Sequence, residues 1–166
     1  MEHARARGYP VPLVHDVAED ALVLERIEGP TMQAELEGRP WRLAGHMRTL
    51  AELHHRLHEI EHPDGGTLLH LDLHPLNVIY GPAGPVVIDW TNAAGGNAAL
   101  DPSLVAVIFL TSGGPAGRVA TPLFLRHFER EEVEQAMPAA IAYRIADPNV
   151  FPHERDRLSR LSRRYG

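Results

Sequence analysis

Residues 70–91 constrain the fold of this chain more than any other stretch, because short apolar runs and polar residues follow one another there at fixed spacing. The stretch begins with the letters HLDLHPLN and continues with two apolar runs, 77–80 and 85–89, on either side of the turn sequence GPAG. Apolar runs of this length around a turn that contains Gly and Pro are typical of a β-hairpin. We therefore expect a hairpin that carries Asn77 at its start and Asp89 at its end.

The clearest helix pattern covers residues 41–60. Its apolar residues recur at steps of three and four positions, which places them on one buried face: Leu43, Met47, Leu50, Leu53, Leu57 and Ile60. His54 and His58 lie four positions apart on the same helix. We expect them to pack or to hydrogen-bond at its inner edge, because the glutamate of a His-Glu-x-x-His metal motif is absent.

Shorter patterns surround this helix. Thr31 is suited to cap a short helix that ends near Gly38, and residues 21–27 are predicted to form a short buried strand. Apolar periodicity predicts further helices at roughly 101–112, 118–130, 132–146 and 153–164. A strand, a long helix, a hairpin and a set of helices in this order indicate an α+β fold with a helical majority.

The composition excludes several classes of protein. The net charge of −6 argues against a general nucleic-acid binder, and the absence of cysteine excludes disulfides and thiolate metal sites. The longest apolar run, 104–110, is too short to cross a membrane, and the first residues lack the apolar segment of a signal peptide. We therefore expect a cytoplasmic protein with no nucleic-acid or membrane partner. All 16 basic residues are arginine, so no mechanism can use a lysine of this chain.

Asp72, Asn77 and Asp89 are residue types that phosphoryl transfer requires. Asp72 is the candidate catalytic residue, because a carboxylate can orient a substrate hydroxyl and accept its proton. The oxygens of Asn77 and Asp89 suit Mg²⁺, which is commonly held by one or two carboxylates together with substrate phosphates. Turn chemistry explains each residue alone, but it does not require their spacing. In this interpretation His70 and His74 support the site structurally.

The same segment allows a second interpretation. In an extended chain, His70, Asp72 and His74 point to one face, so they could form a divalent metal cluster in a metal-dependent hydrolase. Two observations count against it. Pro75 favours a loop over a continuing strand, and the hydrolase leaves Asn77 and Asp89 without a role.

Asp101 opens the predicted helix at 101–112. The following Pro102 fits the first helical position, so capping of this helix explains Asp101 on its own. A role in bracing the loop around Asp72 is a further hypothesis.

Taken together, these residues resemble the aminoglycoside phosphotransferase family, the small-molecule branch of the protein-kinase-like fold. The segment 70–77 is similar to that family's H-G-D-L-H-x-x-N loop, and 87–90, with the letters VIDW, is similar to its metal-binding segment. The resemblance implies a kinase that uses ATP (or GTP) and Mg²⁺ to phosphorylate a hydroxyl on a small molecule. It also implies that Glu25 and Ile27 belong to a hinge that binds adenine, and that Asp101 lies on the helix behind the catalytic loop.

The chain departs from that family at its beginning, where it has neither a glycine-rich phosphate loop nor a lysine. We therefore expect residues 1–29 to be a remnant of the nucleotide-binding small lobe with its hinge, and 30–166 to be the helical catalytic lobe. Such an N-terminally truncated enzyme is expected to have impaired activity, because a phosphate anchor is missing. The alternatives are a degenerate, non-catalytic binding module and the hydrolase. The pattern indicates neither the particular substrate nor the oligomeric state.

Overall fold

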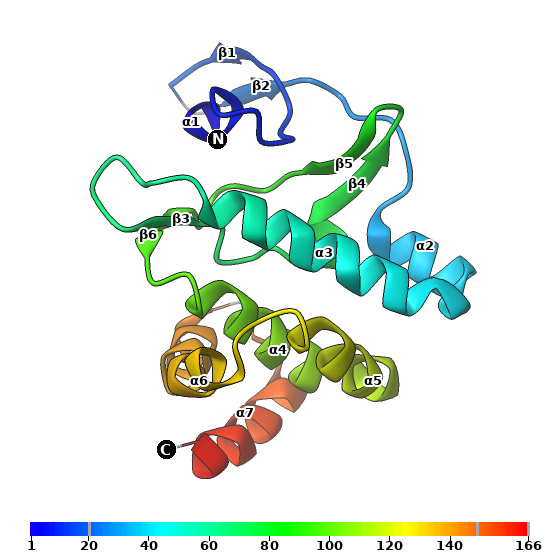
Figure 1. Ribbon diagram of the computed structural model, residues 1–166, viewed down its shortest axis with the longest axis vertical. Helices are drawn as coiled ribbons and strands as arrows, with labels where there is room; N and C mark the ends of the chain where they lie inside the picture. Colours follow the sequence, from blue (N-terminus) through cyan, green and yellow to red (C-terminus); the bar gives the residue numbers. More distant parts are fainter. Residues whose placement is uncertain (20, 149, 166) are drawn as a thin grey trace.

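The computed structural model describes residues 1–19, 21–148 and 150–165 (Figure 1). Its helices are α1 (Glu2–Arg5), α2 (Met32–Gly38), α3 (Leu43–His58), α4 (Leu100–Thr111), α5 (Gly114–Leu125), α6 (Arg130–Ala146) and α7 (Pro152–Tyr165), with 3₁₀ turns η1 (Pro40–Arg42) and η2 (Pro75–Asn77). Its strands pair in antiparallel fashion: β1 (Val14–Val17) with β2 (Leu22–Leu24), β3 (Thr67–Leu69) with β6 (Ala94–Gly96), and β4 (Val78–Gly81) with β5 (Gly84–Val87). The predicted α+β class with a helical majority is confirmed.

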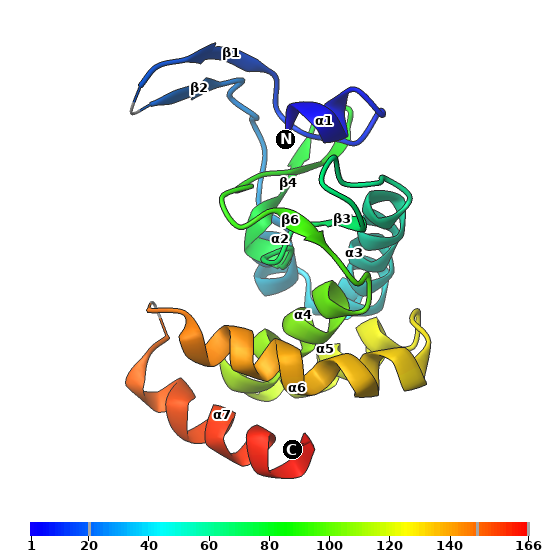
Figure 2. The same cartoon turned by 90° about the vertical axis from the view of Figure 1, so that its left-hand side faces the viewer.

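Helix α3 crosses the middle of the molecule and separates two layers (Figures 1 and 2). Helix α1 and the hairpins β1–β2 and β4–β5 lie on one side, and α4, α5, α6 and α7 lie on the other. Buried apolar residues form two clusters. One joins the first residues of the chain to α3, β4, β5 and α5, and the other joins β3, α4, α6 and α7. The loop that follows β3 contributes to both clusters.

The long helix has the buried face that its periodicity predicts. Met47, Leu50 and Leu57 have no exposed surface. His54 is equally buried, and its Nδ1 donates a hydrogen bond to the carbonyl oxygen of Leu50 at 2.8 Å. His54 therefore packs inside the protein, as expected.

The predicted hairpin is also present. In β4–β5, Val78 lies opposite Val87, and Gly81 lies opposite Gly84. The hairpin is hydrogen-bonded to the segment that precedes α2: the N–H of Tyr80 donates to the carbonyl of Pro30 at 2.9 Å. The cap of α2 is formed as predicted: the Thr31 hydroxyl accepts a hydrogen bond from the N–H of Ala34 at 3.1 Å.

The prediction of a buried strand at 21–27 is wrong. Only Leu22–Leu24 form a strand, β2; its side chains are exposed, and those of β1 are exposed except for the half-buried Val14. Val17 is 67% exposed and Leu22 is 51% exposed. The β1–β2 hairpin projects from the rest of the molecule (Figure 2), so no other element of the described chain covers these apolar side chains. An apolar run predicts a strand, but it does not reveal whether a second layer covers it.

Strand β6 has no strand pattern in the sequence, because it consists of Ala94, Gly95 and Gly96. Its pairing with β3 depends on close approach of the two backbones. A Cβ added to Gly95 would lie 2.4 Å from the carbonyl oxygen of Gly65, so a larger residue does not fit without movement.

The helices after β6 match their predicted positions with one shift. Helix α5 covers Gly114–Leu125 instead of about 118–130: Pro115 fits the first turn of a helix, and the helix ends before the predicted end. In the described ranges, no helix is both long enough and apolar enough to cross a membrane.

Candidate active site

Asp72 lies on a short loop between β3 and η2 that the two apolar clusters hold from both sides. The Leu71 side chain belongs to the cluster of α4 and α6, whereas the Leu73 side chain belongs to the cluster of α3. Each leucine is at most 7% exposed. Because its two neighbours are anchored in opposite directions, the half-buried side chain of Asp72 is turned toward the space between them.

Asp101 fixes the backbone of this loop. Leu71 has a φ of 61°, a left-handed conformation that costs a residue with a side chain roughly 1–2 kcal/mol. The buried Asp101 carboxylate accepts hydrogen bonds from the N–H of Leu71 at 2.7 Å and of His70 at 2.9 Å. It also lies 3.1 Å from His58 Nε2. The expected bracing contact is therefore present.

The expectation that Asp101 caps α4 is wrong. Helix α4 begins at Leu100, and the side chain of Asn97 accepts a hydrogen bond from the N–H of Ala99 just before it. Burial alone would raise the pKa of Asp101, but the hydrogen bonds from His58 and the loop backbone and the nearby His54 lower it below its ordinary value. Asp101 is thus an ionised carboxylate that stabilises the loop instead of its own helix.

His74 orients the Asp72 carboxylate. The Nδ1 atom of His74 accepts a hydrogen bond from the N–H of Leu76 at 3.3 Å, so Nε2 carries the ring proton in the neutral form. This Nε2 lies 3.3 Å from Asp72 Oδ1. Burial would raise the pKa of Asp72, but its contacts with His74, His70 and Asn77 outweigh burial and lower the pKa. Asp72 is therefore ionised at neutral pH and able to accept a proton.

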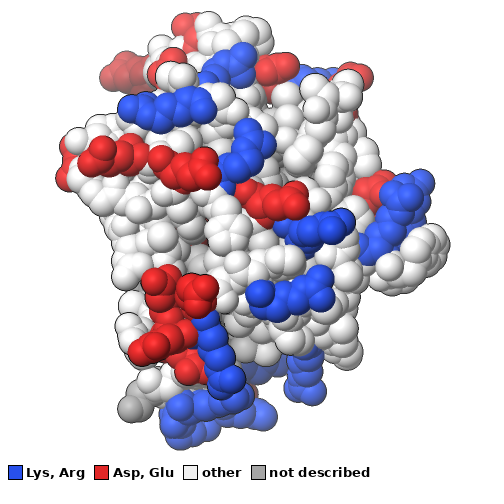
Figure 3. Space-filling view, viewed as in Figure 1, with Lys and Arg blue, Asp and Glu red and all other residues white. Residues whose placement is uncertain are grey.

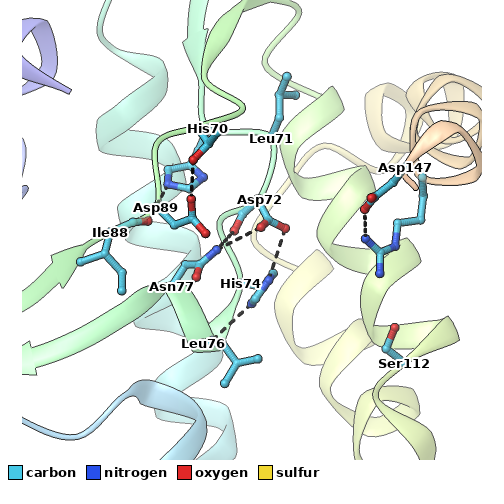
Figure 4. A network of polar contacts seen from close by, with 12 residues as sticks. His70, Leu71, Asp72, His74, Leu76, Asn77, Ile88, Asp89, Ser112 and Asp147 are labelled. Atoms are coloured by element: carbon cyan, nitrogen blue, oxygen red, sulfur yellow. Dashed lines mark hydrogen bonds and ion pairs between the residues drawn. The ribbon is translucent and has the colours of Figure 1, made fainter. Parts of the chain in front are cut away.

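Asn77 stands beside Asp72, and its side-chain orientation is fixed by its partners. Its Nδ2 donates to the backbone carbonyl of Asp72 at 2.8 Å and to Asp72 Oδ2 at 3.1 Å (Figure 4). Because both partners are acceptors, the nitrogen must lie on this side and Oδ1 on the other. The carbonyl oxygen of Asn77 is thus turned away from Asp72 and can serve as a ligand for a cation.

The N–H of Ile88 donates to the backbone carbonyl of Asn77 at 3.0 Å, and the next residue, Asp89, follows β5 (Figure 4). Its φ of 62° is left-handed, and its Oδ1 accepts a hydrogen bond from the Thr91 hydroxyl at 2.8 Å. The preceding residue is hydrogen-bonded to the loop of Asp72, because His70 Nε2 donates to the carbonyl of Ile88 at 3.0 Å. His70 therefore joins the segment of Asp72 to the segment of Asp89.

A cavity of about 650 Å³ opens beside these residues. Asp72, His74 and Asp89 line one wall of it, and α4 and the end of α6 form the opposite wall. The two carboxylates that the sequence singled out thus open into one space. A cavity of this size is within the range of small-molecule sites.

The opposite wall contains polar residues that the sequence analysis did not identify: Tyr143, Arg144 and Asp147. Arg144 Nη1 lies 2.5 Å from Asp147 Oδ2, and Nη2 lies 3.1 Å from the buried Glu154 Oε2. Glu154 also accepts a hydrogen bond from the Ser112 hydroxyl. The helix at 132–146 was predicted, but no local signal shows that its end faces a loop about 70 residues earlier in the chain.

The arrangement does not favour the metal cluster of His70, Asp72 and His74. His70 has no exposed surface, one of its ring nitrogens is bonded to the Ile88 carbonyl, and the other is buried. His74 uses one nitrogen on the backbone and turns the other to Asp72. Within the part of the chain that the structure describes, no group of three or more His, Asp or Glu side chains is placed to hold a metal.

A magnesium site with Asn77 and Asp89 is compatible with the donors present. The set consists of one amide oxygen and one carboxylate, which leaves the remaining positions to phosphate and water oxygens, as Mg²⁺ commonly requires. This set contains only two ligating side chains, of which one is acidic. It is therefore compatible with the finding that the described residues contain no cluster of three or more His, Asp or Glu ligands.

Glu25 and Ile27 lie on the connection between β2 and α2. Glu25 pairs with the first hairpin, because its N–H donates to the Leu13 carbonyl at 2.7 Å and its carboxylate accepts from the N–H of Leu13 at 3.0 Å. Ile27 approaches the turn after β4, where a Cβ on Gly81 would lie 3.2 Å from its side chain. Gly81 is the last residue of β4 and Asn77 directly precedes the strand, so the two lie about 13 Å apart at the usual strand rise.

Comparison with models of known protein families gave no match, and comparison with curated proteins gave none either.

Proposed function

We propose that this chain is a phosphotransferase, or the catalytic part of one, that uses ATP (or GTP) and Mg²⁺ to phosphorylate a hydroxyl group of a small molecule. The observation that carries the proposal is the common orientation of Asp72 and Asp89, which line one cavity, with the amide of Asn77 bonded to Asp72. Asp101 and the buried side chains of Leu71 and Leu73 hold the loop of Asp72, and His70 joins this loop to the segment of Asp89.

In this proposal Asp72 accepts the proton of the substrate hydroxyl. The hydroxyl oxygen forms a bond to the γ-phosphorus, the bond from that phosphorus to the bridging oxygen breaks, and the nucleoside diphosphate leaves. Mg²⁺ bound by Asn77 and Asp89 would neutralise charge on the phosphate oxygens. His74 keeps the Asp72 carboxylate in a fixed orientation, because one of its nitrogens is held by the backbone of η2.

The nucleotide would lie along the β4–β5 hairpin, with its base near Ile27 and its phosphates near Asn77. The distance from Asn77 to Gly81, about 13 Å, is suited to an extended nucleoside triphosphate. The lining of the cavity contains three carboxylates and the paired Arg144. This charge favours a hydroxyl compound that is neutral or cationic over an anionic one.

A second candidate function is a degenerate nucleotide-binding module without catalysis. The absence of lysine favours it, because the chain by itself cannot supply an ammonium group to the phosphates. The two functions differ in whether phosphate is transferred after the nucleotide has bound.

A thermal shift titration and a phosphotransfer assay with a panel of hydroxyl compounds test both functions. We expect ATP with Mg²⁺ to raise the melting temperature of the unaltered chain, and Asp89→Ala to abolish this rise. Asp72→Asn should keep the rise and lose transfer, and Asp64→Asn, which changes a side chain that is 94% exposed, should behave like the unaltered chain. No rise at millimolar nucleotide would contradict both functions, and a rise without transfer would favour the binding module.

A further inference from the structure

A second cavity, of about 570 Å³, lies behind the hairpin and apart from the residues discussed above. It is formed by α2, by the start of α3 and by β4, and its lining consists of Glu35, Arg42, Gly45, His46, Arg48, Thr49 and Tyr80. No residue of this lining takes part in the proposed transfer of phosphate. The cavity is large enough for a small metabolite.

The charge of this cavity is opposite to the charge of the whole chain. Arg42 and Arg48 bring two guanidinium groups to its rim, although the chain has a net charge of −6. The one acidic residue of the lining, Glu35, is neutralised by Arg39, whose Nη1 lies 2.8 Å from Glu35 Oε2. Arg48 has only a loose ion pair, 4.0 Å from Glu52 and exposed to solvent, which is of little energetic weight. Figure 3 shows blue side chains at the right-hand end of the molecule, where α2 and the start of α3 lie.

The inner end of the cavity holds a polar pair. His46 is 8% exposed, and its Nδ1 lies 2.6 Å from the Tyr80 hydroxyl. Burial lowers the pKa of His46, so the ring is neutral at physiological pH. When His46 carries its proton on Nδ1 and donates it to Tyr80, the Tyr80 hydroxyl, which also has a hydrogen-bond contact with Thr49, can turn its own proton toward a ligand. An acceptor in the cavity would select this tautomer.

From these observations we infer that the cavity between α2, α3 and β4 binds a small phosphate-bearing anion, held by Arg42 and Arg48 at the rim and by the hydroxyl of Tyr80 at the inner end. Guanidinium groups form paired hydrogen bonds with phosphate oxygens, and two of them can neutralise a phosphate dianion. The inference does not depend on the proposed transfer reaction, since it uses none of the residues around Asp72.

Inorganic phosphate is the probe for the test. We would titrate it to about 10 mM, ten times a Kd of about 1 mM, at constant ionic strength, and follow the backbone amides by NMR. The amides of Gly45, Thr49 and Tyr80 should shift and saturate with phosphate but not with chloride. Arg42→Gln and Arg48→Gln should each weaken binding by about tenfold or more, because a hydrogen bond to a charged group is lost.

The matched control is Arg130→Gln, which removes the same charge from an exposed position on α6 and should leave phosphate binding unchanged. All three substitutions change exposed side chains, so the variants should fold. Three results would overturn the inference: no shift of the three amides, shifts confined to the residues around Asp72 and Asp89, or undiminished binding by the double variant of Arg42 and Arg48.

Discussion

The two cavities of this protein have opposite charge, although one hairpin contributes to both regions. Asn77, just before β4, is hydrogen-bonded to Asp72, whereas Tyr80, near the end of β4, lines the second cavity together with Arg42 and Arg48. The net charge of the chain therefore says little about either site. Local charge follows from which elements meet: loops that carry aspartates line the first cavity, whereas the second is lined by Arg42, just before α3, and by Arg48, within α3.

The substitution with the largest expected effect changes only the cavity lined by Asp72 and Asp89. In the proposed reaction, Asp72→Asn removes the group that would accept the hydroxyl proton, so the rate of phosphotransfer should fall by about 10²–10⁴-fold. Steady-state kinetics measures this loss, and binding of phosphate to the arginine-lined cavity should stay unchanged. If transfer continued at its full rate, Asp72 would not be the base.

Removal of the Asp101 carboxylate, which accepts hydrogen bonds from the loop of Asp72, should have the next largest effect. Asp101→Ala leaves the buried N–H groups of His70 and Leu71 without acceptors, and each such group costs roughly 1–3 kcal/mol. Urea denaturation should show a loss of about 3 kcal/mol in the free energy of unfolding. The control Asp64→Ala should change it by less than about 0.5 kcal/mol. An equal effect of the two substitutions would show that the loop does not depend on Asp101.

Helix α3 carries a fully buried histidine, His54, and this residue should make stability depend on pH. Burial lowers the pKa of His54 to about 3, from an ordinary value of about 6.5. The unfolded chain therefore binds a proton below pH about 6.5 that the folded chain excludes, and stability falls as the pH falls.

Between pH about 6.5 and 5, the exclusion of this proton should lower the free energy of unfolding by about 2 kcal/mol. The difference in this free energy between the unaltered chain and His54→Leu measures the effect. The leucine variant should lose less stability over this range. Parallel pH profiles of the two proteins would contradict the assigned state of His54.

The smallest expected effect concerns the orientation of Asp72. Because the contact with His74 lowers the pKa of Asp72, His74→Ala should raise this pKa and move the acidic limb of the pH–rate profile to higher pH. At neutral pH the rate should fall by about tenfold or less, since the carboxylate itself remains. His74→Asn can still cap η2 and should recover part of the rate. An unchanged profile in His74→Ala would show that His74 does not act on Asp72.

Local patterns predicted the elements whose signal lies within a few residues. The periodicity of α3 and the turn of β4–β5 were sufficient, because each element satisfies its own backbone hydrogen bonds over a short range. Strand β6 could not be predicted, since its glycines are required by contact with residues about 30 positions earlier. The exposure of β2 could not be predicted for a similar reason: burial depends on what lies opposite a strand.

The same distinction holds for the sites. Asp72, Asn77 and Asp89 were identified because their spacing along the chain is fixed by one loop and one hairpin. Asp101 was expected as a cap, and only the fold shows that its carboxylate turns to the loop. The polar wall that the end of α6 adds to the first cavity and the second cavity, with Arg42 and Arg48, both arise from tertiary packing. No sequence motif predicts either of them.

The most direct measurement is a crystal structure with Mg²⁺ and a non-hydrolysable ATP analogue. We predict a magnesium ion held by the side-chain oxygens of Asn77 and Asp89 and by phosphate oxygens, with the γ-phosphate facing Asp72. A metal ion ligated by His74 with no nucleotide nearby, or a nucleotide bound away from the hairpin, would contradict the proposed function.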